Sequence, residues 1–169
     1  MTMPFTKKNT VLRYMETGEE EKVSALIKNV FAEYIAPDYP IEGQIEFSKY
    51  IVPEAIRERV GEQHFILVAE YDYTIIGVIE VRDYYHVSLF FVDSHFMGKG
   101  IGKELYRQSL EICKRMKPEI TKIEVNSSPY AVPIYEKLGF KSIGKAQTKN
   151  GITFVPMEHL LWEKKWRKK

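Results

Sequence analysis

The sequence lacks most of the features that mark secreted, membrane-spanning or nucleic-acid-binding proteins. Cys113 is its one cysteine, so no disulfide forms within the chain and a reducing compartment is expected. No stretch reaches the roughly 18 consecutive apolar residues of a membrane span. The formal net charge of +2 is too small to indicate a nucleic-acid or membrane partner. Residues 1–8 also lack the apolar core of a signal peptide. We therefore predict a cytoplasmic protein that binds neither nucleic acid nor a membrane.

Metal and thiol chemistry find little support in the sequence. The four histidines and the single cysteine form no ligand-spaced cluster, so no metal site is predicted. Cys113 falls in a helical apolar pattern and is interpreted as a small buried side chain rather than a catalytic thiol. His86 and His95 are interpreted as loop or surface residues. The basic segment Lys164–Lys169 is interpreted as a solvated chain end, with a weak anion-binding or partner patch as the alternative.

The composition that remains is ordinary for a globular protein. With 44% hydrophobic and 28% charged residues, the 169 residues suffice for one buried core. No internal repeat, low-complexity tract or linker divides the sequence. We therefore expect a single domain over residues 1–169.

The N-terminal third is predicted to be helical. Thr17–Glu20 has the spacing of a capping box, and the apolar residues after it recur at helical intervals: Val23, Leu26, Ile27, Val30, Phe31 and Tyr34. A loop over residues 36–40 ends this helix. Two further helices are expected, one over residues 41–50 and one from Pro53 to about Gly61.

The rest of the chain alternates between strand and helix patterns. An antiparallel set of strands is expected over residues 65–70, 75–82 and 87–92, and further strands over 120–125, 140–143 and 153–160. A long helix follows the glycines near residue 100, and its buried face is predicted to carry Ile101, Leu105, Ile112 and Met116. A short helix is expected over residues 131–138, and Asn150-Gly151 predicts the turn of a final hairpin. This order indicates a mixed α+β fold with a mostly antiparallel sheet.

A glycine-rich turn between a strand and a helix is the first motif with chemical content. Three alternate glycines occur in Met97-Gly98-Lys99-Gly100-Ile101-Gly102-Lys103. Such a turn lets the backbone approach a ligand closely and aims free amides at an anion. It is not a P-loop, because Met97 stands where the first glycine is required, and Lys103 replaces the last glycine of a Rossmann fingerprint.

The turn instead resembles the acyl-CoA-binding turn of the GNAT family of N-acetyltransferases. That motif is written Gln/Arg-x-x-Gly-x-Gly/Ala, and Met97 replaces its Gln or Arg here. The segment Asn126–Phe140 resembles the family's second motif, Asn…Ala…Tyr-Glu-Lys-x-Gly-Phe, almost residue for residue. Both motifs occur in the family's order and on the expected elements, so the resemblance covers nearly all of the chain.

The resemblance implies a three-layer α/β/α fold in which the strands over residues 87–92 and 120–125 run parallel and splay apart. Acetyl-CoA, the implied acyl donor, would bind in the gap. The residues implied in binding it are Phe91 and Val92 on the first strand, Met97, Gly98, Lys99, Gly100, Ile101, Gly102 and Lys103 in the turn, and Asn126, Ser128, Ala131 and Tyr135 after the second strand. The implied reaction is transfer of the acetyl group to a primary amine by direct attack in a ternary complex.

The resemblance also suggests catalytic residues. Tyr135 stands where the family usually has its general acid, and its phenol is protonated at neutral pH; packing alone is the alternative. The Val92 amide is the expected oxyanion donor. Glu80, which alternates with apolar neighbours in a predicted strand, is the candidate base. A solvated or cross-strand paired carboxylate is the alternative for Glu80, and a water chain is the alternative base.

The amine acceptor is expected to contact the first two helices, their loop and the Asp83–His86 turn. Aromatic and acidic residues there suit a cation, with ordinary loop and helix packing as the alternative: Tyr34, Asp38, Tyr39, Glu42 and Tyr84. A small amine, an amino acid and a protein amine are all compatible with this set. A non-catalytic acyl-CoA-binding sensor is the alternative function, and a nucleotide-binding protein is a third. A homodimer through exposed strand edges or through the terminal hairpin is also compatible with the sequence.

Overall fold

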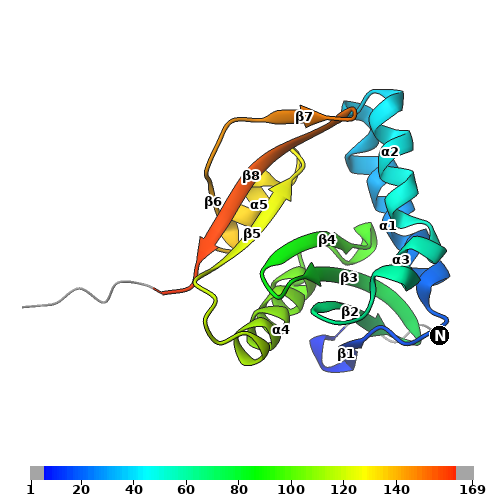
Figure 1. Cartoon of the computed structure of the whole chain (residues 1–169). Coiled ribbons are helices and arrows are strands. Elements are labelled where there is room, and N and C mark those ends of the chain that lie inside the picture. Colours follow the sequence, from blue (N-terminus) through cyan, green and yellow to red (C-terminus); the bar gives the residue numbers. More distant parts are fainter. Residues whose placement is uncertain (1–5, 163–169) are drawn as a thin grey trace, which may run out of the picture.

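A computed structural model describes residues 6–162 of the chain (Figure 1). Its α-helices are α1 (Glu20–Tyr34), α2 (Ile41–Ile51), α3 (Pro53–Arg59), α4 (Ile101–Met116) and α5 (Val132–Lys137), and short 3-10 helices are η1 (Lys7–Asn9), η2 (Ala36–Asp38) and η3 (Ser94–Phe96). The strands are β1 (Thr10–Tyr14), β2 (His64–Tyr71), β3 (Thr74–Arg82), β4 (His86–Val92), β5 (Lys122–Ser127), β6 (Lys141–Ser142), β7 (Gln147–Lys149) and β8 (Ile152–Leu160).

Within the described residues these strands form one mixed sheet. The order of its strands is β1-β2-β3-β4-β5-β8-β6. The short strand β7 is not part of this order and pairs with β8 alone. Neighbours are antiparallel except β4 and β5, which run parallel. A register shift between Glu80 and Val81 leaves Ser88 as an extra residue on β4, which bends that strand.

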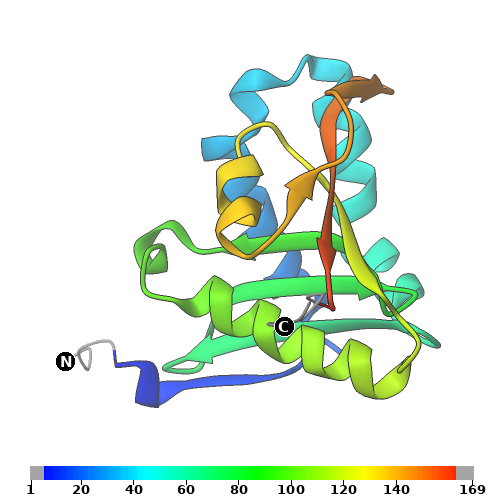
Figure 2. The ribbon, with the colours of Figure 1, turned by 90° about the vertical axis from the view of Figure 1, so that its left-hand side faces the viewer.

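Helices cover both faces of the sheet, which gives three layers (Figure 2). One face packs against α1 and α3 through a core that includes Val23, Ile27, Ile56 and Val78. The other face packs against α4 and α5 through a larger core that includes Leu105, Ile79, Tyr135 and Phe140. Burial of these apolar side chains, worth about 1.5–3 kcal/mol each for the larger ones, holds the layers together. The predicted α+β class with a mostly antiparallel sheet and one parallel pair is confirmed.

Most elements lie where the sequence patterns predict them, but β1 was not predicted. It is an edge strand whose residues are only partly buried, and its partner β2 lies more than fifty residues later in the chain. The predicted final hairpin is also different in detail. The turn at Asn150-Gly151 joins β7 to β8, and the segment after Phe140 pairs with β8 separately as β6.

Three smaller predictions are wrong. The helix start is not a capping box with Thr17, because Glu19 is the N-cap and makes no side-chain capping bond. Met116 on α4 is 53% exposed, because the buried stripe of that helix turns through Tyr106, Ser109 and Cys113. His86 is buried rather than at the surface. Cys113 is buried in the core, as predicted.

Two further findings concern only the described residues. No helix among residues 6–162 is long and apolar enough to cross a bilayer. In the same part of the chain, no group of three or more His, Cys, Asp or Glu side chains is arranged to hold a metal ion. The basic segment Lys164–Lys169 lies outside the described residues, and the single-domain assignment for residues 1–169 stays a prediction.

Candidate active site

The parallel strands β4 and β5 separate along their length. They pair only through His86 with Glu124 and Val87 with Val125, after which β4 continues to Val92 along β3 alone. The Asp93 amide donates to the Ile76 carbonyl at 2.8 Å. Because bonded and non-bonded pairs alternate along an antiparallel ladder, the adjacent Val92 amide is directed away from β3 and toward the gap. The gap therefore has a free backbone edge on its β4 side.

The glycine turn closes one end of this gap. Gly98 and Gly100 have φ values of +75° and +81°, a left-handed conformation that glycine adopts without strain. Gly100 is the N-cap of α4, so the free amides and positive end of that helix face the turn. Gly102 lies close to β4, since a Cβ there would be 3.3 Å from the Phe90 ring. The turn thus has the backbone geometry of an anion site.

A cavity of about 610 Å³, here named the turn cavity, opens above this turn. All the predicted turn residues except Lys99 line it, together with Phe91, Val92, Ala131 and Tyr135. Lys103, in the first turn of α4, and Lys137, in the last turn of α5, also line the cavity and add positive charge to it. Met97, which replaces a polar residue of the family motif, also packs against the apolar core beneath α1. Its contribution to the cavity is therefore apolar.

The second motif forms the opposite wall of the gap. The Ser128 hydroxyl accepts a bond from the Ala131 amide at 3.3 Å and so orders the turn that leads into α5. Asn126 and Ser128 do not line the turn cavity but a second cavity of about 290 Å³, here named the aromatic cavity. Tyr135 and Ala131 line both cavities, as do Phe90, Phe91 and Ile35. The two cavities therefore adjoin at Tyr135.

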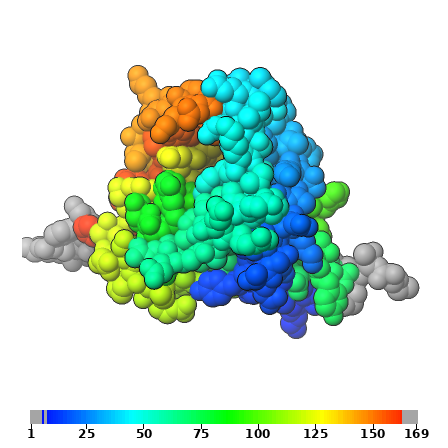
Figure 3. All heavy atoms as spheres, turned by 45° about the vertical axis from the view of Figure 1, so that its right-hand side comes forward, coloured from blue at the N-terminus to red at the C-terminus, as the bar shows by residue number. Residues whose placement is uncertain are grey.

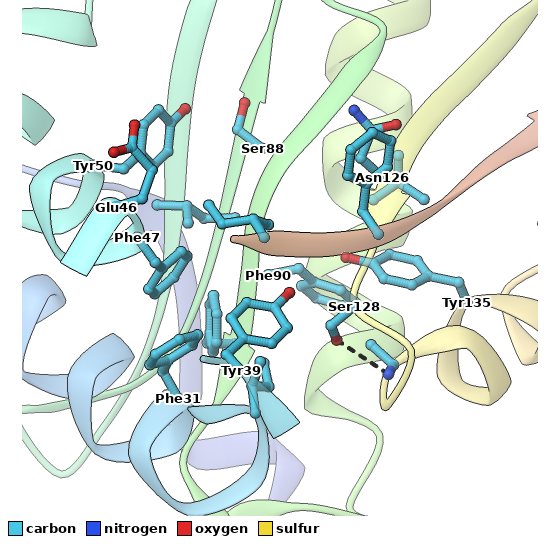
Figure 4. A pocket seen from close by; sticks show the side chains of 17 residues that line it. Phe31, Tyr39, Glu46, Phe47, Tyr50, Ser88, Phe90, Asn126, Ser128 and Tyr135 are labelled. Carbon is cyan, nitrogen blue, oxygen red and sulfur yellow. Dashed lines mark hydrogen bonds between the residues drawn. The ribbon is translucent and has the colours of Figure 1, made fainter. Parts of the chain in front are cut away.

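Tyr135 is held by packing rather than by a charged partner. Its ring lies edge-on to Phe140 at 5.3 Å and beside Phe90 at 5.9 Å, and its residue is 6% exposed. Its hydroxyl is directed toward the aromatic cavity (Figure 4). Burial raises the pKa of this phenol above its ordinary value, so it stays protonated at neutral pH. A protonated phenol in this position is able to donate a hydrogen bond.

The aromatic cavity is lined by residues of α1, α2, β4, β5 and β8, by Tyr39 after η2, and by the start of α5. Of the five side chains expected there, only Tyr39 lines it; Tyr34 instead packs on Tyr130 at 5.3 Å. The sequence patterns did not identify Glu46 and Tyr50, which project from α2 and face Asn126 and Tyr135 across the cavity (Figure 4). Their spacing of four residues on a predicted helix was the available signal, because it puts both on one helix face.

Glu80 is placed differently from the expected base. It is 0% exposed and lines neither cavity. Its carboxylate accepts bonds from Arg59 (3.1 Å) and from the Tyr50 hydroxyl (2.8 Å), and His64 Nε2 lies 3.1 Å away without hydrogen-bond geometry. Burial raises the pKa of Glu80, but the contacts from His64 and Arg59 outweigh it and hold this pKa below its ordinary value. This geometry fits a buried ion pair better than a base.

The mixed sheet with its diverging parallel pair and the flanking helices form the fold of GNAT acetyltransferases. The chain belongs to the GNAT acetyltransferase family, since the family described as "Acetyltransferase (GNAT) domain" matches residues 35–161. The similarity to N-acetylaspartate synthetase of Danio rerio is 35% identity over 75 residues, which are 43% of this chain. The matched region spans only 27% of that relative's length.

Solved structures share the whole fold. A GCN5-related N-acetyltransferase from Rhodopseudomonas palustris aligns with a TM-score of 0.78 over 95% of this chain and 100% of its own, at 16% identity. The PaiA N-acetyltransferase of Thermoplasma acidophilum, solved in complex with coenzyme A, aligns with a TM-score of 0.70 over 89% of this chain and 98% of its own, at 21% identity. At these identities the likeness concerns the fold.

Proposed function

We propose that the protein is an acetyl-CoA-dependent N-acetyltransferase that moves an acetyl group to a primary amine by direct attack in a ternary complex. The observation that carries the proposal is the meeting of two cavities at Tyr135, where β4 and β5 diverge. Two substrates held in adjoining cavities are able to react directly, without a covalent enzyme intermediate. Holding both in line supplies much of the rate enhancement.

The chain's own residues fit the coenzyme. The turn cavity of about 610 Å³ is within the usual range for ligand sites, roughly 300–1,000 Å³. The left-handed Gly98 and Gly100, the N-terminus of α4 and Lys103 suit a pyrophosphate. The free edge of β4 at Val92 suits the amide-rich pantetheine arm. A related structure solved with coenzyme A supports this assignment.

Bound acetyl-CoA supplies the thioester carbonyl that the amine attacks and the thiolate that leaves. The Val92 amide, directed into the gap, donates a hydrogen bond to the carbonyl oxygen as negative charge grows on it. Tyr135 Oη donates its proton to the sulfur as the C–S bond breaks, and the proton that the attacking nitrogen releases on forming the C–N bond returns to the phenolate through water. The ammonium group of the acceptor, with an ordinary pKa of about 10.4, must lose a proton before it attacks. Water takes this proton, because Glu80 is enclosed and ion-paired and is therefore a poor proton acceptor.

Two measurements test the proposed function. Titration calorimetry with acetyl-CoA, CoA and ATP should show binding of both coenzyme forms and weak or no binding of ATP. Release of free thiol from acetyl-CoA, followed across a panel of primary amines, should rise well above the rate without acceptor. Tight coenzyme binding with no thiol release for any amine would favour the sensor instead. Preference for ATP would favour a nucleotide-binding protein. The cytoplasmic location and the homodimer stay predictions.

A further inference from the structure

The charge on the described residues that line the aromatic cavity is negative only. Of the described residues that line it, Glu46 is the only one that carries a charge. Its carboxylate has an exposed partner, Lys49, whose Nζ lies 3.4 Å away and whose side chain is 70% exposed. An acceptor cation therefore meets a carboxylate at this wall, and the cation that now faces Glu46 is able to move into solvent.

Arg59, a half-buried cation that contacts Tyr50, is not available to an acceptor. Arg59 directs Nε and Nη2 to the Glu80 carboxylate and Nη1 to the Tyr50 carbonyl at 2.6 Å. Its guanidinium does not line the aromatic cavity. A carboxylate on the acceptor would thus lose its water without gaining a positive partner. A charge buried in this way is strongly disfavoured.

Tyr50 is fixed in place by the same ion pair. Its hydroxyl donates to Glu80, and the Arg59 guanidinium lies 3.6 Å from its ring centroid. Because that hydroxyl proton is engaged, the lone pairs of Tyr50 Oη are what remains for a ligand, and these accept hydrogen bonds from an amine or ammonium. Burial and the Glu80 charge raise the pKa of Tyr50 to about 12, so it remains a neutral acceptor.

Apart from Ser88, Asn126 and Ser128, which are polar but uncharged, the remaining side chains that line the cavity are mainly aromatic and aliphatic. Phe31 stacks on Phe47 with a centroid distance of 4.1 Å, Tyr39 lies edge-on to Phe31 at 5.7 Å, and Phe91 lies 6.2 Å from Phe47. Figure 4 shows Phe31, Tyr39 and Phe47 together on one side of the cavity. A volume of about 290 Å³ admits only a small body between them. Aromatic faces attract both apolar groups and cations.

We propose that the acceptor is a small primary monoamine with an apolar body and no carboxylate, and that Glu46 and Tyr50 bind its nitrogen. This inference rests on the proposed function and names the substrate class of its acceptor site. An α-amino acid is disfavoured, because its carboxylate finds no cation among the described residues that line the cavity. A polyamine is disfavoured, because its second cation finds no carboxylate beyond Glu46 among the described residues that line the cavity.

Matched acceptors test the substrate class. Thiol release should be measured with 2-phenylethylamine against phenylalanine, with pentylamine against norleucine, and with spermidine. We expect kcat/KM to be at least about a hundredfold higher for each amine than for its amino acid. Equal or reversed preference, or spermidine as the best acceptor, would overturn the inference while leaving the proposed function intact. If no acceptor of any kind gave thiol release, both the inference and the proposed function would be overturned.

Variants of α2 test the two residues. Glu46→Gln should raise KM for 2-phenylethylamine about tenfold with kcat nearly unchanged, because a charge-assisted bond is lost. Glu42→Gln makes the same charge change one turn earlier, where the side chain is exposed and lines neither cavity, and should leave KM unchanged. Equal KM values in the two variants would remove Glu46 from the site.

Tyr50→Phe separates nitrogen binding from folding. It removes Oη but keeps the ring on which Arg59 packs, and it should also raise KM for the monoamine severalfold. The affinity for CoA, measured by calorimetry on the same protein, should be unchanged if the variant is folded. Glu46→Arg is the complementary change and should bring the phenylalanine and 2-phenylethylamine rates within about tenfold of each other. An undiminished preference for the amine in Glu46→Arg would contradict the assignment.

Discussion

Tyr135 lies at the wall shared by both cavities, and its role is testable at the level of one oxygen atom. Tyr135→Phe keeps the ring contacts with Phe90 and Phe140 and removes only the proton donor. We expect kcat for acetyl transfer to fall at least about tenfold, because the leaving thiolate loses its acid. The Kd for CoA should change little. Equal turnover in the two proteins would remove the acid assignment.

His86 provides a pH-dependent test of the sheet. Burial, followed by repulsion from Arg82, lowers the pKa of His86 to about 4, while Glu124 and Asp83 act in the opposite direction. Between about pH 6.5 and pH 4 the unfolded chain therefore binds a proton that folded His86 does not. The free energy of unfolding should fall as the pH falls through this window, by about 3 kcal/mol from this residue, and should lose nothing more from it below pH 4.

The His86→Gln variant isolates that contribution. Urea unfolding near about pH 7 and about pH 4.5 should show a smaller acid-induced loss of stability in this variant than in the parent protein, by about 2 kcal/mol. His95→Gln is the control, because the His95 side chain is 86% exposed. Parallel losses in all three proteins would show that His86 is protonated when folded.

At the scale of a single element, the glycine turn at the N-terminal end of α4 is testable by substitution. Gly100→Ala forces a residue with a Cβ into a φ of +81°, which costs about 1 kcal/mol of stability. Relief of that strain shifts the amides that face the turn cavity, so we expect the Kd for CoA to rise about fivefold or more. Gly61→Ala is the control, since a Cβ there meets nothing within 4 Å and its backbone is not left-handed. An unchanged CoA affinity in Gly100→Ala would argue against phosphate binding by the turn.

The elements also show what the sequence was able to predict. Local signals predicted most of the helices, most of the strands and both motifs, because periodicity, proline and glycine act within a few residues. The strand β1 was missed because its pairing depends on β2, far away in sequence. The partners of the buried Glu80 come from α2, α3 and β2, so the tertiary structure was needed to predict its ion pair.

The acceptor side of the site was predicted least well for the same reason. Helix α2 carries apolar Ile41 and Ile45 on its exposed side, at 69% and 51%, so hydrophobic periodicity does not identify its inner face. Which side chains of α2 meet β4 and β8 depends on how the helix packs across the sheet. The coenzyme side was predicted more completely, because there the backbone of a contiguous turn determines the geometry.

At the scale of the whole molecule, two contacts join the part of the chain up to β4 to the part from β5 onward, one at each end of the gap between β4 and β5. At the narrow end, β4 and β5 share two residue pairs. At the wide end, α2 meets the β7–β8 turn, as Figure 3 shows for the cyan and orange segments at the top. There Gly43 and Gly151 lie backbone to backbone, and the Tyr39 hydroxyl donates to the Thr153 carbonyl at 2.9 Å. The aromatic cavity lies between these two junctions.

The contact at the wide end predicts a selective defect. A Cβ at Gly43 would lie 2.1 Å from the Gly151 carbonyl oxygen, so Gly43→Ala must separate α2 from the hairpin. Overpacking of this kind costs about 1–3 kcal/mol of stability. Because the displaced elements wall the aromatic cavity and not the turn cavity, KM for the amine should rise severalfold while the Kd for CoA stays constant. Ser48→Ala, an exposed position on the same helix, is the control. Loss of CoA affinity in Gly43→Ala equal to the loss of amine affinity would show that the two cavities are not independently held.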